Sequence, residues 1–154
     1  MPSKLKVSPK MEDYLTTIYH LCEQEQVARV KTIAERLKVT NAGVVGALKS
    51  LKTKGLVQQE HYGYVRLTEQ GEGIARAVVH RHEVLTHFFQ GILNLDSETA
   101  AQDACKIEHA VSPETVRRIN ALGAFIERRP RSSGLDWKEE FSRFCGEFSD
   151  GNVK

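Results

Sequence analysis

The segment formed by residues 28–57 constrains the fold of this chain more than any other stretch. It opens with ARVKTIAERL, in which apolar side chains recur at the spacing of one helical face. The residues KVTN then allow a tight turn, with Thr40 or Asn41 as the N-cap of a second helix, and Gly55 provides a stop for that helix. A short helix, a tight turn and a capped second helix form the pattern of a helix-turn-helix.

The second of these helices is predicted to be amphipathic. Its buried face is expected to consist of Val44, Val45, Leu48 and Leu51. Its outward face carries Lys49, Lys52 and Lys54. Lysines on one face of such a helix suit contacts to DNA phosphates, although an ordinary solvated helix face has the same composition.

Two short strand-like runs, LVQQE and YVRLT, follow the second helix. The residues HYG join them, and Gly63 can adopt the positive φ that a tight hairpin needs. A helix-turn-helix followed by a hairpin has the order of a winged helix. The alternative is an arbitrary helical pair followed by an unrelated hairpin.

The rest of the chain is predicted to be helical. A long helix is expected after a cap at Thr68, another over residues 97–110, and a third after an N-cap at Ser112. The predicted fold class is therefore mainly α. An N-terminal winged helix-turn-helix with a small β-hairpin wing, residues 1–70, precedes an all-helical domain, residues 71–154.

Composition narrows the class of function only slightly. The net charge of +2 is too small to indicate nucleic-acid binding by itself, so that case depends on where the basic residues lie. No apolar run is long enough to cross a membrane, and the first residues lack the apolar core of a signal peptide. The 3 cysteines lie far apart without a CxxC pair, which favours a reducing cytoplasm over a disulfide framework. We therefore expect a cytoplasmic protein with no membrane partner.

One stretch of the helical half, AQDACKIEHAVSPE, contains a thiol, a carboxylate and an imidazole in close succession. Cys105, Glu108 and His109 stand at i, i+3 and i+4, which places them on one side of a helix if the stretch is helical. Two interpretations are open. The stretch is either half of a metal site or a buried cysteine beside two solvated polar residues.

Five stretches occur together in a recognisable order: MEDYLTTIYHL, ARVKTIAERLKVT, GYVRLTEQG, VVHRHEVLTHFFQGILNLD and DACKIEHAVSPE. In these stretches the chain resembles the diphtheria toxin repressor and manganese transport regulator family, over roughly residues 8–125. It is similar to the short branch without a C-terminal SH3-like domain. The resemblance implies a homodimeric repressor of metal-uptake genes rather than an enzyme. Its helical domain would bind metal and dimerise, and a divalent transition metal would activate binding to a near-palindromic double-stranded DNA operator.

The resemblance also implies a set of metal ligands. They fall on Asp13, His82, Cys105, Glu108 and His109. Manganese-responsive relatives pair an aspartate with a glutamate where this chain has Cys105, whereas iron-responsive relatives pair a methionine with a cysteine. Because this chain combines Asp13 with Cys105, we expect Fe(II), with Mn(II) close behind, and Zn(II) or Co(II) as ions that can bind in vitro.

A second metal position of the family is not matched. Relatives supply Glu or His at the positions that here hold Thr16, Thr86 and Ala101. We therefore expect one well-formed site per subunit, with any extra ion near His82 weakly held.

The positions that read bases in the family are occupied mainly by small residues here. They correspond to Thr40, Asn41, Ala42, Gly43 and Gly46. The residues expected to contact phosphates are Lys31, Lys49, Lys52 and Arg66. Few direct hydrogen bonds to base edges are available, so we expect contact with thymine methyl groups and sensitivity to DNA shape.

Two other functions fit part of the pattern. A winged-helix regulator that responds to an organic ligand, or to thiol oxidation at Cys105, would not need Asp13. A metalloenzyme could use a glutamate beside metal-binding histidine and cysteine as a base. The sequence shows no Ser–His–Asp-type set or phosphate loop, and an enzyme would leave the winged helix unexplained.

Overall fold

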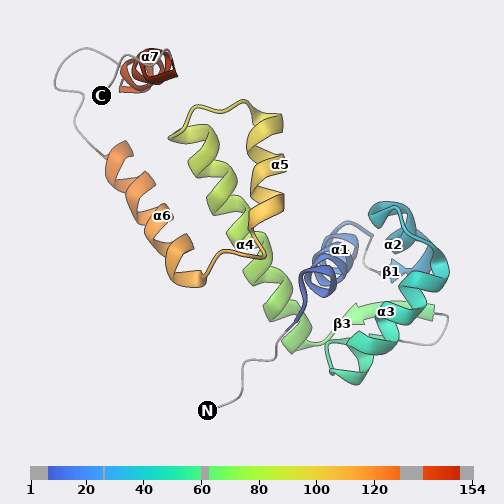
Figure 1. Cartoon of the computed structure of the whole chain (residues 1–154). Helices are drawn as coiled ribbons and strands as arrows, with labels where there is room; N and C mark the ends of the chain where they lie inside the picture. The colour runs from blue at the N-terminus through green and yellow to red at the C-terminus, as the bar shows by residue number, and fades with distance from the viewer. Residues whose placement is uncertain (1–6, 26, 60–62, 129–136, 150–154) are drawn as a thin grey trace. The chain divides into compact units, whose positions relative to one another are not determined.

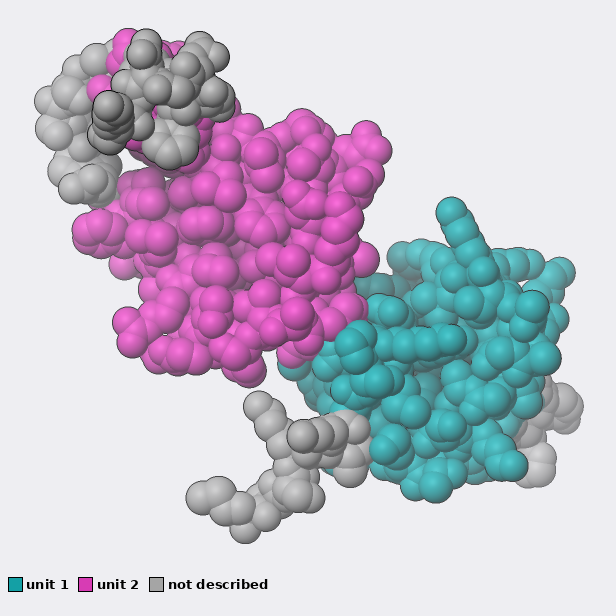
Figure 2. Space-filling view, viewed as in Figure 1, with its two compact units in different colours: residues 1–80 teal, residues 81–154 magenta. Residues whose placement is uncertain are grey.

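The computed structural model describes residues 7–25, 27–59, 63–128 and 137–149 (Figure 1). The chain forms two compact units, Met1–His80 and Arg81–Lys154, which Figure 2 colours teal and magenta. The first unit thus runs beyond residue 70, where we expected the boundary, because it includes the N-terminal part of the long helix α4 (Glu69–Gly91).

The first unit contains a helix-turn-helix and a small sheet. Its elements before α4 are α1 (Pro9–Glu25), β1 (Ala28–Arg29), α2 (Val30–Leu37), α3 (Asn41–Thr53), β2 (Val57–Gln59) and β3 (Tyr64–Leu67). The strands form one antiparallel sheet in the order β1-β3-β2, and the β2–β3 pair is the predicted hairpin. The predicted mainly helical fold with an N-terminal winged helix is confirmed. Strand β1 was not predicted, because its 2 residues are too few for a periodic pattern.

Local chemistry fixes the turn between α2 and α3. Lys38 ends α2 in the left-handed region, with φ 54°. The Thr40 hydroxyl accepts a hydrogen bond from the Gly43 N–H at 3.1 Å, so Thr40 rather than Asn41 is the N-cap of α3. Gly55 follows α3 with φ 70°, as its predicted role as a helix stop requires.

The inward face of α3 differs from the predicted face at one position. Val44, Leu48 and Leu51 are buried as expected. Val45 is 57% exposed, so its prediction as a buried residue is wrong. The residues at 44, 48 and 51 follow the i, i+4, i+7 stripe, and one residue further along the helix turns the side chain about 100° away from that stripe.

Helix α4 begins against the segment that follows α3. The Thr68 hydroxyl accepts from the Gly71 N–H at 3.1 Å and donates to the Gly55 carbonyl at 2.7 Å. The Thr68 N–H donates to the Leu56 carbonyl at 3.1 Å. A Cβ at Gly71 would overlap the backbone carbonyl of Leu56, so only glycine permits this close approach.

The second unit is entirely helical within the residues described. It contains the C-terminal part of α4, followed by α5 (Ser97–Ile107), α6 (Pro113–Glu127) and α7 (Trp137–Ser149). Asp96 caps α5 and Ser112 caps α6, the latter as predicted. Helix α5 ends at Ile107 rather than at residue 110, and Glu108 is its C-cap. No helix in the described part of the chain is long and apolar enough to cross a membrane.

We predict that Gly71→Ala lowers the free energy of unfolding by about 1–3 kcal/mol, because the added methyl group must push α4 away from the Leu56 backbone. Urea unfolding followed by circular dichroism measures the change. Gly73→Ala is the matched control, since nothing lies within 4 Å of a Cβ there. The control should gain about 0.5–1 kcal/mol from the lower entropy of its unfolded chain. Equal stability of the two variants would contradict the prediction.

Candidate metal centre and DNA-binding face

A buried carboxylate lies at the centre of the candidate metal site. Glu108 is 7% exposed and stands at the C-terminal end of α5. Its Oε2 lies 2.6 Å from Nδ1 of His82 on α4, and its Oε1 lies 3.4 Å from Nε2 of His109. Two imidazole rings therefore flank one carboxylate within the second unit.

Arg81 holds the backbone of the same residue. Its Nε donates to the Glu108 carbonyl at 2.8 Å, across from α4 to the end of α5. A charged donor strengthens such a bond, so Arg81 fixes the end of the helix from which the carboxylate projects. Sequence reasoning missed this residue. Its position directly before His82 is the only signal, and a basic residue there is equally consistent with a solvated helix face.

The side chains brought together here suit a divalent transition metal. One carboxylate and two imidazoles provide oxygen and nitrogen donors, which bind Mn(II), Fe(II) and Zn(II). A carboxylate removed from water needs a compensating cation or several hydrogen bonds, and His82 supplies one such bond. Burial of Glu108 also excludes the interpretation of this stretch as a buried cysteine beside solvated polar groups, because Cys105 is the exposed residue.

The other two predicted ligands, Cys105 and Asp13, lie on two different helices. Cys105 lies in the last turn of α5 and is exposed. Asp13 lies on α1 in the first unit and is half-buried. The structure thus brings together three of the five predicted ligands, and the participation of Asp13 and Cys105 remains a prediction.

The residues predicted to bind DNA are all exposed in the first unit. They are Lys31, Thr40, Asn41, Gly43, Lys49, Lys52 and Arg66. The hydroxyl groups of Ser50 and Thr53 on α3 donate to carbonyls of the preceding turn, at 3.4 and 3.0 Å. These two hydroxyl groups therefore already use their protons within α3. Asn41 and the lysines of α3 carry the other polar groups that are predicted to contact DNA.

The sheet of the first unit contains an arginine–tyrosine pair that was not predicted from the sequence. Arg29 of β1 lies with its guanidinium carbon 5.1 Å from the ring centre of Tyr64, its partner on β3, and its Nη2 donates to the Tyr64 hydroxyl at 3.3 Å. Stacking on an aromatic ring restrains the arginine side chain. The pair could not be found from the sequence because β1 itself was not predicted.

Family models match both halves of the chain. The domain described as iron dependent repressor, N-terminal DNA binding, matches residues 6–65, and the one described as iron dependent repressor, metal binding and dimerisation, matches residues 68–134. The HTH-type transcriptional regulator MntR of Bacillus pumilus is 36% identical over 127 residues, which cover 82% of this chain and 87% of that protein. MntR of Bacillus subtilis is 37% identical over 121 residues, with 78% and 84% covered. The chain belongs to this family of metal-dependent DNA-binding repressors.

Solved structures of a manganese regulator and of a manganese-dependent repressor share the fold. The manganese regulator SloR has a TM-score of 0.67 at 28% identity, covering 77% of this chain and 55% of that one. A manganese-dependent transcriptional repressor in complex with manganese has a TM-score of 0.64 at 30% identity, covering 75% and 53%. This repressor therefore spans about half the length of those two solved chains.

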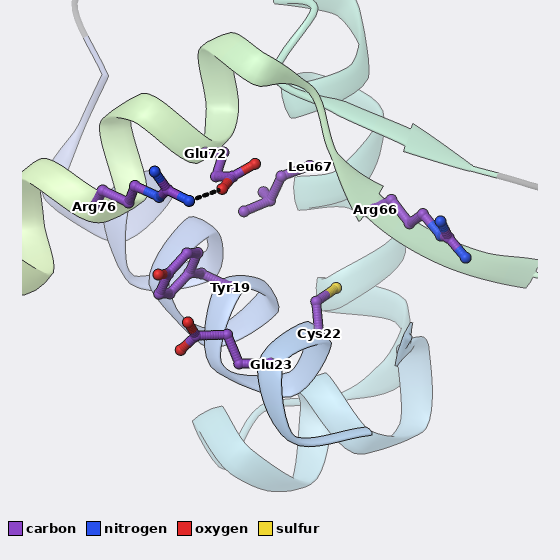
Figure 3. A pocket seen from close by; sticks show the side chains of 7 residues that line it. All are labelled: Tyr19, Cys22, Glu23, Arg66, Leu67, Glu72 and Arg76. Carbon is purple, nitrogen blue, oxygen red and sulfur yellow. Dashed lines mark ion pairs between the residues drawn. The ribbon is translucent and has the colours of Figure 1, made fainter. Parts of the chain in front are cut away.

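The DNA-binding unit of this repressor also contains a pocket of about 370 Å³ between α1, β3 and the start of α4 (Figure 3). Its lining includes Cys22, whose thiol donates to the Val65 carbonyl at 3.8 Å. Burial raises the pKa of the Cys22 thiol above its usual value. Since only a thiolate reacts rapidly with oxidants, we expect this cysteine to react slowly.

We predict that Cys22 reacts with iodoacetamide more slowly than Cys105 and Cys145 in the folded, metal-free protein near neutral pH. Both of the latter are exposed, whereas Cys22 is half-buried and its pKa is raised. Mass spectrometry of peptides from a timed reaction measures the three rates. In guanidinium chloride the three rates should converge. Faster modification of Cys22 than of the exposed cysteines would contradict the prediction.

Proposed function

We propose that this repressor controls metal-uptake genes in the cytoplasm. It binds a near-palindromic operator as a homodimer when one Fe(II) or Mn(II) ion is bound per subunit. The ligands are Asp13, His82, Cys105, Glu108 and His109. The observation that carries the proposal is the Glu108 carboxylate, buried between the imidazoles of His82 and His109.

The three ligands in the second unit give the site its affinity for divalent ions. A buried carboxylate attracts a cation more strongly than an exposed one, because the surrounding dielectric is lower. Neutral imidazole nitrogens bind first-row metals well, and their proximity to Glu108 allows both to be ligands with little rearrangement. Arg81 supports this arrangement through the Glu108 carbonyl.

Of the two remaining ligands, only Cys105 favours iron over manganese. Asp13 supplies a hard oxygen donor, which suits Mn(II) and Fe(II) equally. Cys105 supplies a softer sulfur donor, which suits Fe(II), Co(II) or Zn(II) better than Mn(II). Zn(II) binds tightly to such a set, but its tetrahedral preference satisfies only four of the five ligands. Fe(II) is therefore the expected activator, followed by Mn(II).

The positions of the ligands in the chain predict that metal binding and DNA binding are thermodynamically coupled. Asp13 belongs to the DNA-binding unit, whereas the other four belong to the helical unit. An ion bound by both restricts the motion of one unit relative to the other and favours the arrangement that binds the operator. DNA must then raise metal affinity by the same factor as metal raises DNA affinity.

Operator recognition relies mainly on phosphate contacts and on shape. Lys31, Lys49, Lys52 and Arg66 contact phosphates, and Thr40 and Asn41 lie at the N-terminus of α3, where N–H groups also favour phosphate. The exposed Val45 adds an apolar surface suited to a thymine methyl group.

We predict that Fe(II) and Mn(II) restore operator binding to dialysed, metal-free protein, and that Fe(II) does so at the lower free concentration. Asp13→Ala should lose this activation, because the ion then contacts only the helical unit, while its circular dichroism spectrum is unchanged. Anaerobic fluorescence anisotropy at buffered free metal, with a duplex selected from a random pool, measures both effects. Glu25→Ala removes an exposed carboxylate from the end of the same helix and is the control.

Undiminished metal activation in Asp13→Ala would refute the bridging role of Asp13. Operator binding that is equally strong without metal would favour a regulator that responds to an organic ligand or to thiol oxidation. Turnover in a hydrolase screen would favour a metalloenzyme.

We also predict that Lys49→Ala weakens binding to operator and random DNA by similar factors. It should reduce the slope of log affinity against log salt concentration by about 1, since one phosphate contact is lost. Anisotropy titrations across a salt series measure the slope. Lys106→Ala removes an exposed lysine of α5 that pairs with Asp103, and should leave the slope unchanged. A loss confined to the operator would instead show that Lys49 reads a base.

A further inference from the structure

One buried hydroxyl group on the helix that carries His82 has no hydrogen-bond partner among the described residues. The Oγ1 atom of Thr86 on α4 is buried from solvent and contacts no donor or acceptor among the described residues. Hydroxyls at other helical positions, such as Thr16, Ser50 and Thr53, donate to backbone carbonyls of the preceding turn. Because buried polar groups in proteins are almost always paired, the Thr86 hydroxyl calls for a partner other than the described protein groups.

The position of Thr86 indicates what that partner is. Thr86 follows His82 by four residues on α4, and residues at this spacing project from the same face of a helix. His82 is the residue of α4 that contacts the Glu108 carboxylate. The Thr86 hydroxyl therefore projects from the face that carries a predicted metal ligand, one turn further along.

A hydroxyl at this position suits water better than a second ion. Threonine is uncharged, so it cannot replace the Glu or His that relatives supply to a second metal. It can, however, accept and donate hydrogen bonds, as a water molecule requires. Mn(II) and Fe(II) with carboxylate and imidazole ligands keep water when the protein does not supply every ligand.

We propose that the Thr86 hydroxyl hydrogen-bonds a water ligand of the metal ion held by His82, Glu108 and His109, and so raises the affinity of the site. This inference rests on the proposed function. Thr86 is a positioning residue, which acts on the ion through the water. Partners of this kind change metal affinity about 10–100-fold when they are removed.

Thr86→Val tests the proposal, because valine keeps the shape of threonine and removes only the hydroxyl. In the metal-free protein the melting temperature should be unchanged or higher, since an unpaired buried hydroxyl is lost. Affinity for Mn(II), measured by competition with a fluorescent chelator, should fall about 10–100-fold. Water-proton relaxation by bound Mn(II) should also change, which a purely structural role would not produce. Thr86→Ser keeps the hydroxyl and should retain the affinity to within a few-fold.

Thr53→Val, which removes a hydroxyl bonded to the Lys49 carbonyl, is the control and should bind Mn(II) like the unmodified protein. Equal Mn(II) affinity of Thr86→Val and the unmodified protein would overturn the role of Thr86 and leave the proposed function standing. A lower melting temperature of metal-free Thr86→Val would also overturn it, because the hydroxyl would then be paired without metal. Failure of the unmodified protein to bind Mn(II) or Fe(II) would overturn the proposed function itself.

Discussion

The carboxylate of Glu108 is nearly removed from water, and residues of α4 and of the end of α5 surround it. An isolated buried carboxylate is strongly unfavourable, so the fold must supply positive or proton-donating groups close to it. His82 approaches one oxygen from α4, and His109 approaches the other from just beyond α5. Arg81 fixes the backbone from which the carboxylate projects. The same burial that makes such a group costly in the metal-free fold would strengthen its attraction for a divalent ion in the proposed site.

Helix α4 relates this centre to the DNA-binding unit through the chain itself. Its N-terminus is hydrogen-bonded through Thr68 to Gly55, the residue that follows the C-cap of α3. Its first turn lies so close to Leu56 that only Gly71 fits. The same helix then continues to His82, which is a predicted metal ligand. The closely packed start and the predicted ligand therefore belong to one continuous helix.

Elements set by local chemistry could be predicted from the sequence, whereas side-chain partners between elements could not. The caps at Thr40, Thr68 and Ser112 were predictable because each requires only a hydroxyl at the right offset from an apolar run. The orientation of Val45 was predicted wrongly, since two adjacent valines satisfy the same apolar pattern and only packing selects which one is buried. The ligand set depended on resemblance to a family, because the spacing of Cys105, Glu108 and His109 left both interpretations open.

The other features that could not be predicted from the sequence are contacts between separate elements. Arg81 and Glu108 are separated by 27 residues, and the hydrogen bond between them joins a guanidinium to a backbone carbonyl. Every residue has such a carbonyl, so the identity of the residue at position 108 does not predict this bond. Arg29 and Tyr64 meet because the register of β1 and β3 pairs them, and a strand of 2 residues cannot be recognised by alternation.

Selection of the metal cannot rest on affinity alone in a site of this composition. Oxygen, nitrogen and sulfur donors together bind Zn(II) more tightly than Fe(II) or Mn(II), following the general order for divalent ions. A repressor that responded to occupancy would therefore respond to zinc first.

If activation requires ligands from both units at once, an ion that is satisfied by four ligands of the helical unit gains nothing from Asp13. Such an ion binds without favouring the DNA-binding arrangement, and by linkage DNA does not raise its affinity. Under the same condition, ions with higher coordination numbers would gain from Asp13 and would be selected by the conformation that they stabilise. Asp13 would then discriminate between metals by coordination number, and Cys105 by softness.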